Sequence, residues 1–276
     1  MEKMLKGIFA KKIFRRLCLL SLWLILVYSI TLYTIQDRLI YYPDKFYTAP
    51  DGHLSVFQEN IIDAKDNNPI LTWYVKGKKN KPVILFFHGN SGQIAKFASH
   101  LLYFVARNYT VIMMEYRGFG AITVPGGQKE FFEDSMSVYD WLKEQGYEKI
   151  IVYGYSLGTS LAVNVAAHRQ TEGLILTAPF SSMRILVKEK HIPLASLLLK
   201  DSYDSLSVMK NIQTPTLIIH GKEDKLIPDH HSKMLYDASE STRKSLIFLE
   251  NEDHASIFFK DKDIPFILDW LGEEPE

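Results

Sequence analysis

Short runs of almost uninterrupted apolar residues alternate with longer helical patterns through most of this 276-residue chain. Such runs are typical of strands that are covered on both faces. Their alternation with helices predicts βα units around a mostly parallel sheet. We expect strands at residues 71–77, 83–88, 110–116, 150–154, 173–178, 216–221 and 245–250, the first of them antiparallel.

Helical spacing occurs between these strands, at residues 93–107, 129–145, 157–168, 230–238 and 264–271. The stretch 180–211 breaks the alternation and is longer than a plain connection requires. We therefore predict one domain, residues 37–276, with an insertion at about 180–211 over one end of the sheet. The apolar residues 191–199 within it are compatible with a lid or acyl-chain groove near a membrane, or with a helix that packs on the core.

Composition excludes several classes of protein. The chain has 32 Lys and Arg residues against 32 Asp and Glu residues, so no basic field is available for nucleic-acid phosphates. Its single cysteine, Cys18, forms neither an internal disulfide nor a cysteine-based zinc site. Nucleic acid is therefore not an expected partner, and no metal or organic cofactor is implied.

The N-terminal region contains an uncharged apolar stretch, residues 17–35, of about the length that spans a bilayer as a helix. Six Lys and Arg residues precede it within residues 1–16. The positive-inside rule then predicts a cytoplasmic N-terminus and a catalytic domain on the opposite side, periplasmic, extracellular or lumenal. A cleaved signal peptide and a buried or interfacial helix are the alternatives, although the sequence lacks a good small-x-small cleavage site.

The sequence GYSLG, residues 154–158, lies between a predicted strand and a predicted helix, the context that a G-x-S-x-G nucleophile elbow requires. Gly154 and Gly158 remove crowding on either side of Ser156 at a sharp turn. Because Ser156 precedes a helix, the N–H of Leu157 and the helix dipole can stabilise an oxyanion. Ser156 is therefore the candidate nucleophile.

A serine nucleophile needs a histidine base and a carboxylate that fixes the histidine tautomer, in the chain order Ser, acid, His. Asp224 follows a late strand and His254 follows the last one, so both face the same sheet edge as Ser156. Glu223 is a rival for the acid. His230 and His231 also follow a strand, but they head a helix and are expected to cap it or to lie in solvent.

Two further loops end at the same edge. The strand at 83–88 leads into His88, Gly89 and Asn90, and the main-chain N–H of Asn90 is the expected second oxyanion donor. We expect His88 to anchor this loop rather than to act as a base. Tyr116 and Arg117, which follow the next strand, are expected to shape the floor of the site, although an ordinary glycine turn also explains the YRGFG sequence.

With these motifs in order, the sequence resembles the α/β-hydrolase superfamily from about Arg38 to Leu271, and more narrowly the membrane-anchored Bem46-type α/β-hydrolase-domain proteins. The resemblance implies an α/β-hydrolase fold with helices on both faces of the sheet and a short cap between its sixth and seventh strands. It also implies a serine hydrolase with Ser156, Asp224 and His254 as triad. Residues 121–127 depart from the usual pattern after YRGFG, as does Glu252 two residues before His254.

The mechanism that these residues predict is acyl transfer to water through an acyl-Ser156 intermediate. An ester or thioester with a lipid-like acyl group is the expected substrate, because the anchor and the apolar insertion would both lie near a membrane. A serine peptidase or amidase on the same triad remains open, as does a non-catalytic, membrane-tethered binding module on a hydrolase scaffold. The sequence does not predict an oligomeric state.

Overall fold

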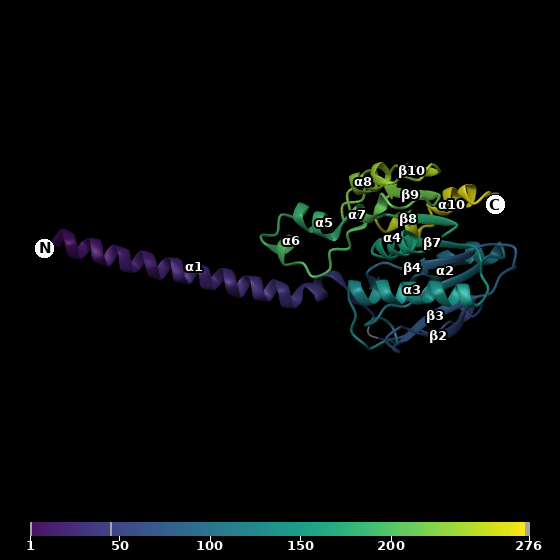
Figure 1. Ribbon diagram of the computed structural model, residues 1–276, viewed down its shortest axis with the longest axis horizontal. Coiled ribbons are helices and arrows are strands. Elements are labelled where there is room, and N and C mark those ends of the chain that lie inside the picture. Colours follow the sequence, from purple (N-terminus) through teal and green to yellow (C-terminus); the bar gives the residue numbers. More distant parts are fainter. Residues whose placement is uncertain (1, 45, 274–276) are drawn as a thin grey trace.

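The computed structural model describes residues 2–44 and 46–273, so Met1, residue 45 and the last three residues of the predicted domain lie outside it (Figure 1). Its main sheet has eight strands in the order β10-β9-β8-β7-β4-β6-β3-β2. They are β2 (Gln58–Asp63), β3 (Pro69–Val75), β4 (Val83–Phe87), β6 (Thr110–Met114), β7 (Ile150–Tyr155), β8 (Gly173–Thr177), β9 (Thr216–Gly221) and β10 (Lys244–Leu249). Only the β2–β3 and β3–β6 pairs are antiparallel.

Helices cover both faces of this sheet, in agreement with the predicted α/β-hydrolase fold. Side chains of the central strand β4 alternate between two hydrophobic cores, with Leu85 and Phe87 in one and Ile84 and Phe86 in the other. The first core packs against α3 (Gln128–Glu144), α4 (Gly158–His168) and α8 (His230–Ala238). The second packs against α2 (Ile94–Ala106), α9 (Ser256–Phe259) and α10 (Ile264–Trp270).

Two pairings were not predicted. Strand β2, with the sequence QENIID, is an edge strand whose side chains are mostly exposed, so it lacks the apolar signature of the central strands. A two-residue strand β1 (Tyr42–Pro43) pairs with β5 (Ser91–Gly92) in a separate small sheet. A 3-10 helix, η1 (Gly52–Leu54), follows β1. The β1–β5 pair joins the end of the first helix to the loop after β4.

The first helix, α1 (Glu2–Ile40), projects from the body as a long rod (Figure 1). It is longer than the apolar stretch 17–35, because the flanking Lys, Arg and Leu residues are also good helix formers. Within the described residues it is the one helix long and apolar enough to cross a membrane. The insertion forms α5 (Met183–Glu189), α6 (Ala195–Leu198) and α7 (Ser205–Met209) between the sixth and seventh strands of the main sheet. In Figure 1, α5 and α6 lie on the side from which α1 leaves the body.

Candidate active site

The turn from β7 to α4 holds Ser156 in a left-handed conformation, with a φ of 53°. A non-glycine residue there is strained, which is a feature of nucleophile elbows. The turn is also too tight for side chains on either flank. A Cβ at Gly154 would lie 2.4 Å from the carbonyl oxygen of Gly158, and one at Gly158 would lie 2.0 Å from the carbonyl oxygen of Phe87. The two glycines therefore allow strand, elbow and helix to pack together.

Ser156, His254 and Asp224 form one chain of hydrogen bonds. His254 Nε2 lies 2.9 Å from Ser156 Oγ, and His254 Nδ1 lies 2.6 Å from Asp224 Oδ2. A carboxylate accepts only, so Nδ1–H donates to Asp224 and Nε2 can accept the serine proton. Ser156 and Asp224 are buried, whereas the His254 side chain is 16% exposed. The structure thus brings together the three residues that the sequence predicts as a triad.

The Asp224 carboxylate is held in place from several sides. Its Oδ1 accepts hydrogen bonds from the N–H groups of Leu226 and Ile227. Its Oδ2 also lies 3.3 Å from Nε2 of His220, a buried residue on β9. Burial raises the pKa of Asp224, but the hydrogen bonds from His220, His254 and Ile227 outweigh it, so this pKa lies well below its usual range. The carboxylate therefore remains charged.

Sequence reasoning missed two residues that support the triad. The sequence places His220 near the end of a predicted strand, and its position four residues before Asp224 is the signal that could have identified it. Tyr155, the variable residue before Ser156, donates through its hydroxyl to the carbonyl oxygen of His254 at 2.8 Å. It also stacks on Phe258 of α9, which follows the His254 loop. The loop that carries the base is thereby fixed to the elbow.

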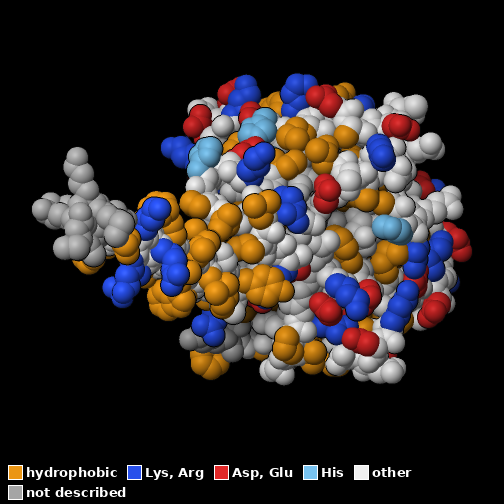
Figure 2. All heavy atoms as spheres, turned by 60° about the vertical axis from the view of Figure 1, so that its left-hand side comes forward, with side chains coloured by type: hydrophobic (Ala, Val, Ile, Leu, Met, Phe, Trp, Pro, Cys, Tyr) orange, Lys and Arg blue, Asp and Glu red, His pale blue; other side chains and the backbone are white. Residues whose placement is uncertain are grey.

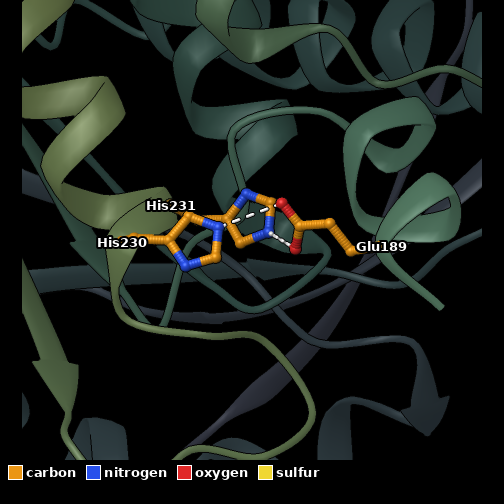
Figure 3. A group of neighbouring side chains, drawn as sticks. All are labelled: Glu189, His230 and His231. Carbon is orange, nitrogen blue, oxygen red and sulfur yellow. Dashed lines mark hydrogen bonds and ion pairs between the residues drawn. The ribbon is translucent and has the colours of Figure 1, made fainter.

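The rival acid and bases lie elsewhere. Glu223 is exposed, and its N–H donates to the carbonyl oxygen of Glu252. Figure 3 shows His230 and His231 directed at Glu189, with Nε2 to carboxylate distances of 3.0 and 3.1 Å. Both histidines begin α8 and Glu189 ends α5, so these contacts fasten the insertion to the core.

The same three side chains include the donor types that bind transition metals. Their ligand atoms lie within 4.8 Å of one another. In the structure they hydrogen-bond to each other, and His231 Nδ1 also contacts Ser181 Oγ at 2.7 Å. Burial lowers the pKa of His231, although Glu189 raises it. We assign this cluster the role of a polar link between α5 and α8.

The two predicted oxyanion donors flank Ser156. Asn90 and Leu157 both line the cavity that contains Ser156. No hydrogen bond among the described residues uses the N–H of either one. The Asn90 side chain instead donates to the carbonyl oxygen of Ile40 at 2.6 Å. The main-chain carbonyl oxygen of Asn90 accepts from the N–H of Tyr42 at 2.8 Å. The orientation of this loop therefore depends on the segment that ends α1.

His88 is fully buried and occupies the base of the same loop. Its Nδ1 contacts the carbonyl oxygen of Gly89 at 2.7 Å, and its Nε2 contacts Glu115 at 2.9 Å. The Tyr116 hydroxyl donates to the His88 carbonyl oxygen at 2.6 Å. Gly89 packs beside the ring of Tyr155, where an added Cβ would be 3.3 Å away. His88, Gly89 and Tyr116 thus support the loop that carries Asn90.

Arg117 does not lie at the floor of the site, where we expected it. It binds Asp134 on α3 and Asp66 in the β2–β3 turn, through two hydrogen bonds to each carboxylate. These contacts lower the pKa of Asp66 and raise that of Arg117. The sequence neighbour Tyr116 instead contacts the loop after β4, through its hydrogen bond to His88.

A cavity of about 250 Å³ opens in front of Ser156 between α1 and the insertion. Its walls are mostly aliphatic. The α1 residues in its lining are Leu32, Gln36, Leu39 and Ile40, and those from residues 180–199 are Phe180, Met183, Leu186, Val187, Lys190, Ile192, Ala195, Leu198 and Leu199. The loop after Asp224 adds Leu226 and Ile227. Lys190 is the single charged residue among the described residues of this lining.

Comparison with known proteins agrees with this geometry. Residues 78–208 and 194–261, more than half of the chain, match the family model described as "Serine aminopeptidase, S33". The chain belongs to this family. It is thus a serine hydrolase of the α/β-hydrolase superfamily, of the type that includes esterases and lipases.

Individual relatives extend the comparison. The chain is 27% identical to the lysophosphatidylserine lipase ABHD12 of Rattus norvegicus over 90% of its own length and 72% of the relative's. The Pyrococcus furiosus esterase Pf2001 superposes with a TM-score of 0.69 at 16% identity, covering 84% of this chain and 98% of the esterase. A bacterial membrane phospholipase A superposes with a TM-score of 0.61 at 16% identity, covering 98% of this chain and 99% of the other. The esterase and the phospholipase A therefore share the fold of this chain.

Proposed function

We propose that this protein is a membrane-anchored lipid esterase that cleaves an acyl ester or thioester through an acyl-Ser156 intermediate. The observation that carries the proposal is the aliphatic cavity between α1 and the insertion, which has Ser156 in its lining. A nucleophile in the lining of an apolar cavity suits a substrate with a reactive carbonyl at the end of a hydrocarbon chain. The lipase and phospholipase named among the similar proteins support the same substrate class.

In the proposed mechanism, His254 Nε2 takes the proton of Ser156 as Oγ attacks the acyl carbonyl. The Asp224 carboxylate stabilises the imidazolium that forms, and the N–H groups of Asn90 and Leu157 bind the oxyanion. His254 then gives its proton to the departing alcohol or thiol. It next removes a proton from water, whose oxygen attacks the acyl-serine carbonyl. His254 then returns that proton to Ser156 Oγ as the acyl–oxygen bond breaks, which releases the fatty acid and free Ser156.

An aminopeptidase fits the cavity less well. Such an enzyme must bind the free α-ammonium group of its substrate, and a buried ammonium needs a carboxylate partner. Among the described lining residues the charged side chain is a lysine, which would repel that group. A carboxylate or phosphate near the lipid headgroup would instead be attracted to Lys190. The non-catalytic binding module is disfavoured by the complete hydrogen-bonded triad.

The anchor in this proposal is α1. Its side chains are exposed along the apolar stretch, with Leu22 63% and Trp23 58% exposed, as expected of a surface that faces lipid. The basic residues before it favour a cytoplasmic N-terminus, so the catalytic domain would lie across the membrane.

A chain-length series tests the proposal. The full chain in detergent micelles should hydrolyse p-nitrophenyl esters with a kcat/KM that rises from acetyl to medium and long acyl groups. Ser156→Ala should abolish the reaction across the series. Equal kcat/KM values for all chain lengths would contradict the lipid substrate, and residual activity in Ser156→Ala within a few-fold of the parent would contradict the mechanism.

A further inference from the structure

The insertion contacts α1 over a stretch that runs from near the C-terminal end of this helix towards its N-terminus. Gln36 makes two hydrogen bonds to the insertion. Its Nε2 donates to the carbonyl oxygen of Leu198 at 3.2 Å, and its Oε1 accepts from the N–H of Lys200 at 2.7 Å. Eight residues earlier on the helix, the Tyr28 hydroxyl donates to the carbonyl oxygen of Pro193 at 3.0 Å. At 1.5 Å per residue, the contact extends about 12 Å along α1.

Charges fix the position of α1 in a bilayer. Residues 17–36 carry no charge, whereas Arg15 and Arg16 precede them and Asp37 and Arg38 follow. Twenty helical residues span about 30 Å, the thickness of the hydrocarbon core, so Gln36 lies at one boundary and cannot move far from it. Tyr28 is then about 12 Å inside the hydrocarbon. Because Pro193 contacts Tyr28, the tip of the insertion reaches the same depth.

The composition of this tip, which we define as residues 192–199, suits hydrocarbon. Its sequence IPLASLLL has no charge, and Lys188, Lys190 and Lys200 lie just outside it. Ile192 is 47% exposed and Leu197 is 74% exposed, a costly arrangement in water. Figure 2 shows hydrophobic side chains gathered where the helix meets the body, with Lys and Arg side chains around them. Lys200 also pairs with Asp37 at 3.1 Å, which places both charges at the expected membrane boundary.

Three carbonyl oxygens of the tip accept hydrogen bonds from side chains outside it. Irregular backbone within a bilayer is tolerated only where its polar groups have protein partners. Tyr28 and Gln36, unusual residues for an anchor, bind the carbonyl oxygens of Pro193 and Leu198. The guanidinium group of Arg184 donates to the carbonyl oxygen of Ser196, the third of these bonds.

We propose that residues 192–199 are immersed in the outer leaflet beside α1, and that the cavity takes its acyl chain directly from that leaflet. The inference rests on the proposed function, because it requires α1 to span a membrane. Leu32 of α1 and Ile192 and Leu198 of the tip all line the cavity, so its mouth lies between two hydrocarbon-facing elements. A lipid would move laterally between them and bring its ester to Ser156 without crossing water.

Depth measurement tests the immersion. In a Cys18→Ser background, Leu197→Cys carries a nitroxide label on the full chain in phosphatidylcholine vesicles. Lys149→Cys is the control, because Lys149 is 62% exposed just before β7, at the sheet edge opposite Ser156. We expect the label at 197 to be accessible to oxygen and shielded from a water-soluble nickel chelate, with the reverse at 149. A label at 197 that behaves like the one at 149, on protein that stays with the vesicles, overturns the inference alone. Protein that washes off the vesicles overturns the anchor and the inference together.

An activity measurement provides a second test. Leu197 does not line the cavity, so Leu197→Asp should leave hydrolysis of a short soluble ester within about twofold of Leu197→Ala. A charge held in hydrocarbon is unfavourable, so the same variant should hydrolyse phospholipid in vesicles about tenfold more slowly. Equal rates of Leu197→Asp and Leu197→Ala on vesicles would contradict the immersion. Loss of the short-ester activity in both variants would overturn the inference in another way, because the tip would then be needed for catalysis itself.

Discussion

Two regions of the molecule differ in how their residues are held. One is the sheet edge with the triad; the other, which we call the α1–insertion region, is where the insertion packs against α1. At the sheet edge, Ser156 and Asp224 follow the buried strands β7 and β9, and His254 follows the half-buried β10. The buried residues His220 and Tyr155 contact Asp224 and the His254 loop. In the α1–insertion region, α6 has only four residues, and side chains such as Leu197 remain exposed. Under the proposed function, the sheet sets the chemistry, whereas the α1–insertion region selects the substrate and its source.

The largest effect is expected at the acid. Asp224→Asn should lower kcat/KM for a short ester by about 10⁴-fold, because an amide favours the wrong tautomer of His254. Glu223→Gln is the matched control and should have little effect, since Glu223 is exposed one residue away. Steady-state kinetics on both variants measure this difference. A larger loss of kcat/KM in Glu223→Gln than in Asp224→Asn would mean that Glu223 is the acid of the triad.

The packing of the elbow should be the next most sensitive feature. Gly158→Ala puts a Cβ 2.0 Å from the Phe87 carbonyl oxygen, so we expect it to lower the free energy of unfolding by about 3 kcal/mol. Gly89→Ala, whose Cβ would meet a movable ring at 3.3 Å, should cost much less. Denaturant unfolding monitored by circular dichroism compares the two. Equal stabilities would mean that the turn can relax.

A smaller effect should appear where the two regions meet. Asn90→Ala removes the hydrogen bond to Ile40 while keeping the main-chain N–H, so kcat for a short ester should fall by about tenfold through misplacement of the oxyanion donor. KM should change little. Ser91→Ala, in the next position of the same loop, is the control. An unchanged kcat in Asn90→Ala would show that the β1–β5 pair positions this loop without the side chain.

The smallest effect should be confined to substrate choice. Val187 lines the cavity and Ile185, on the same helix, does not. Val187→Trp should fill the cavity and reduce hydrolysis of long acyl esters by about tenfold, with acetyl ester hydrolysis unchanged. Ile185→Trp should alter neither. If the two variants gave the same chain-length profile, the acyl chain would have to bind elsewhere.

Much of the sheet and the triad could be predicted from the sequence, because central strands are apolar on both faces and strand-end loops meet at one edge. Strand β2 was missed because its edge position leaves most side chains exposed. Arg117 was misplaced because its partners, Asp66 and Asp134, are remote in the sequence. The sequence pattern of residues 191–199 is compatible with both a lid and a helix that packs on the core. The contact between Tyr28 and Pro193 depends on tertiary structure and has no local signal.

The central claim is that Ser156 is an activated nucleophile in the lining of the apolar cavity. Labelling of the full chain by a fluorophosphonate probe tests it most directly, with Ser156→Ala as the partner sample and circular dichroism as the check on folding. The account predicts strong labelling of the parent and none of the folded variant. A folded parent that does not label, or a variant that labels equally well, would contradict it.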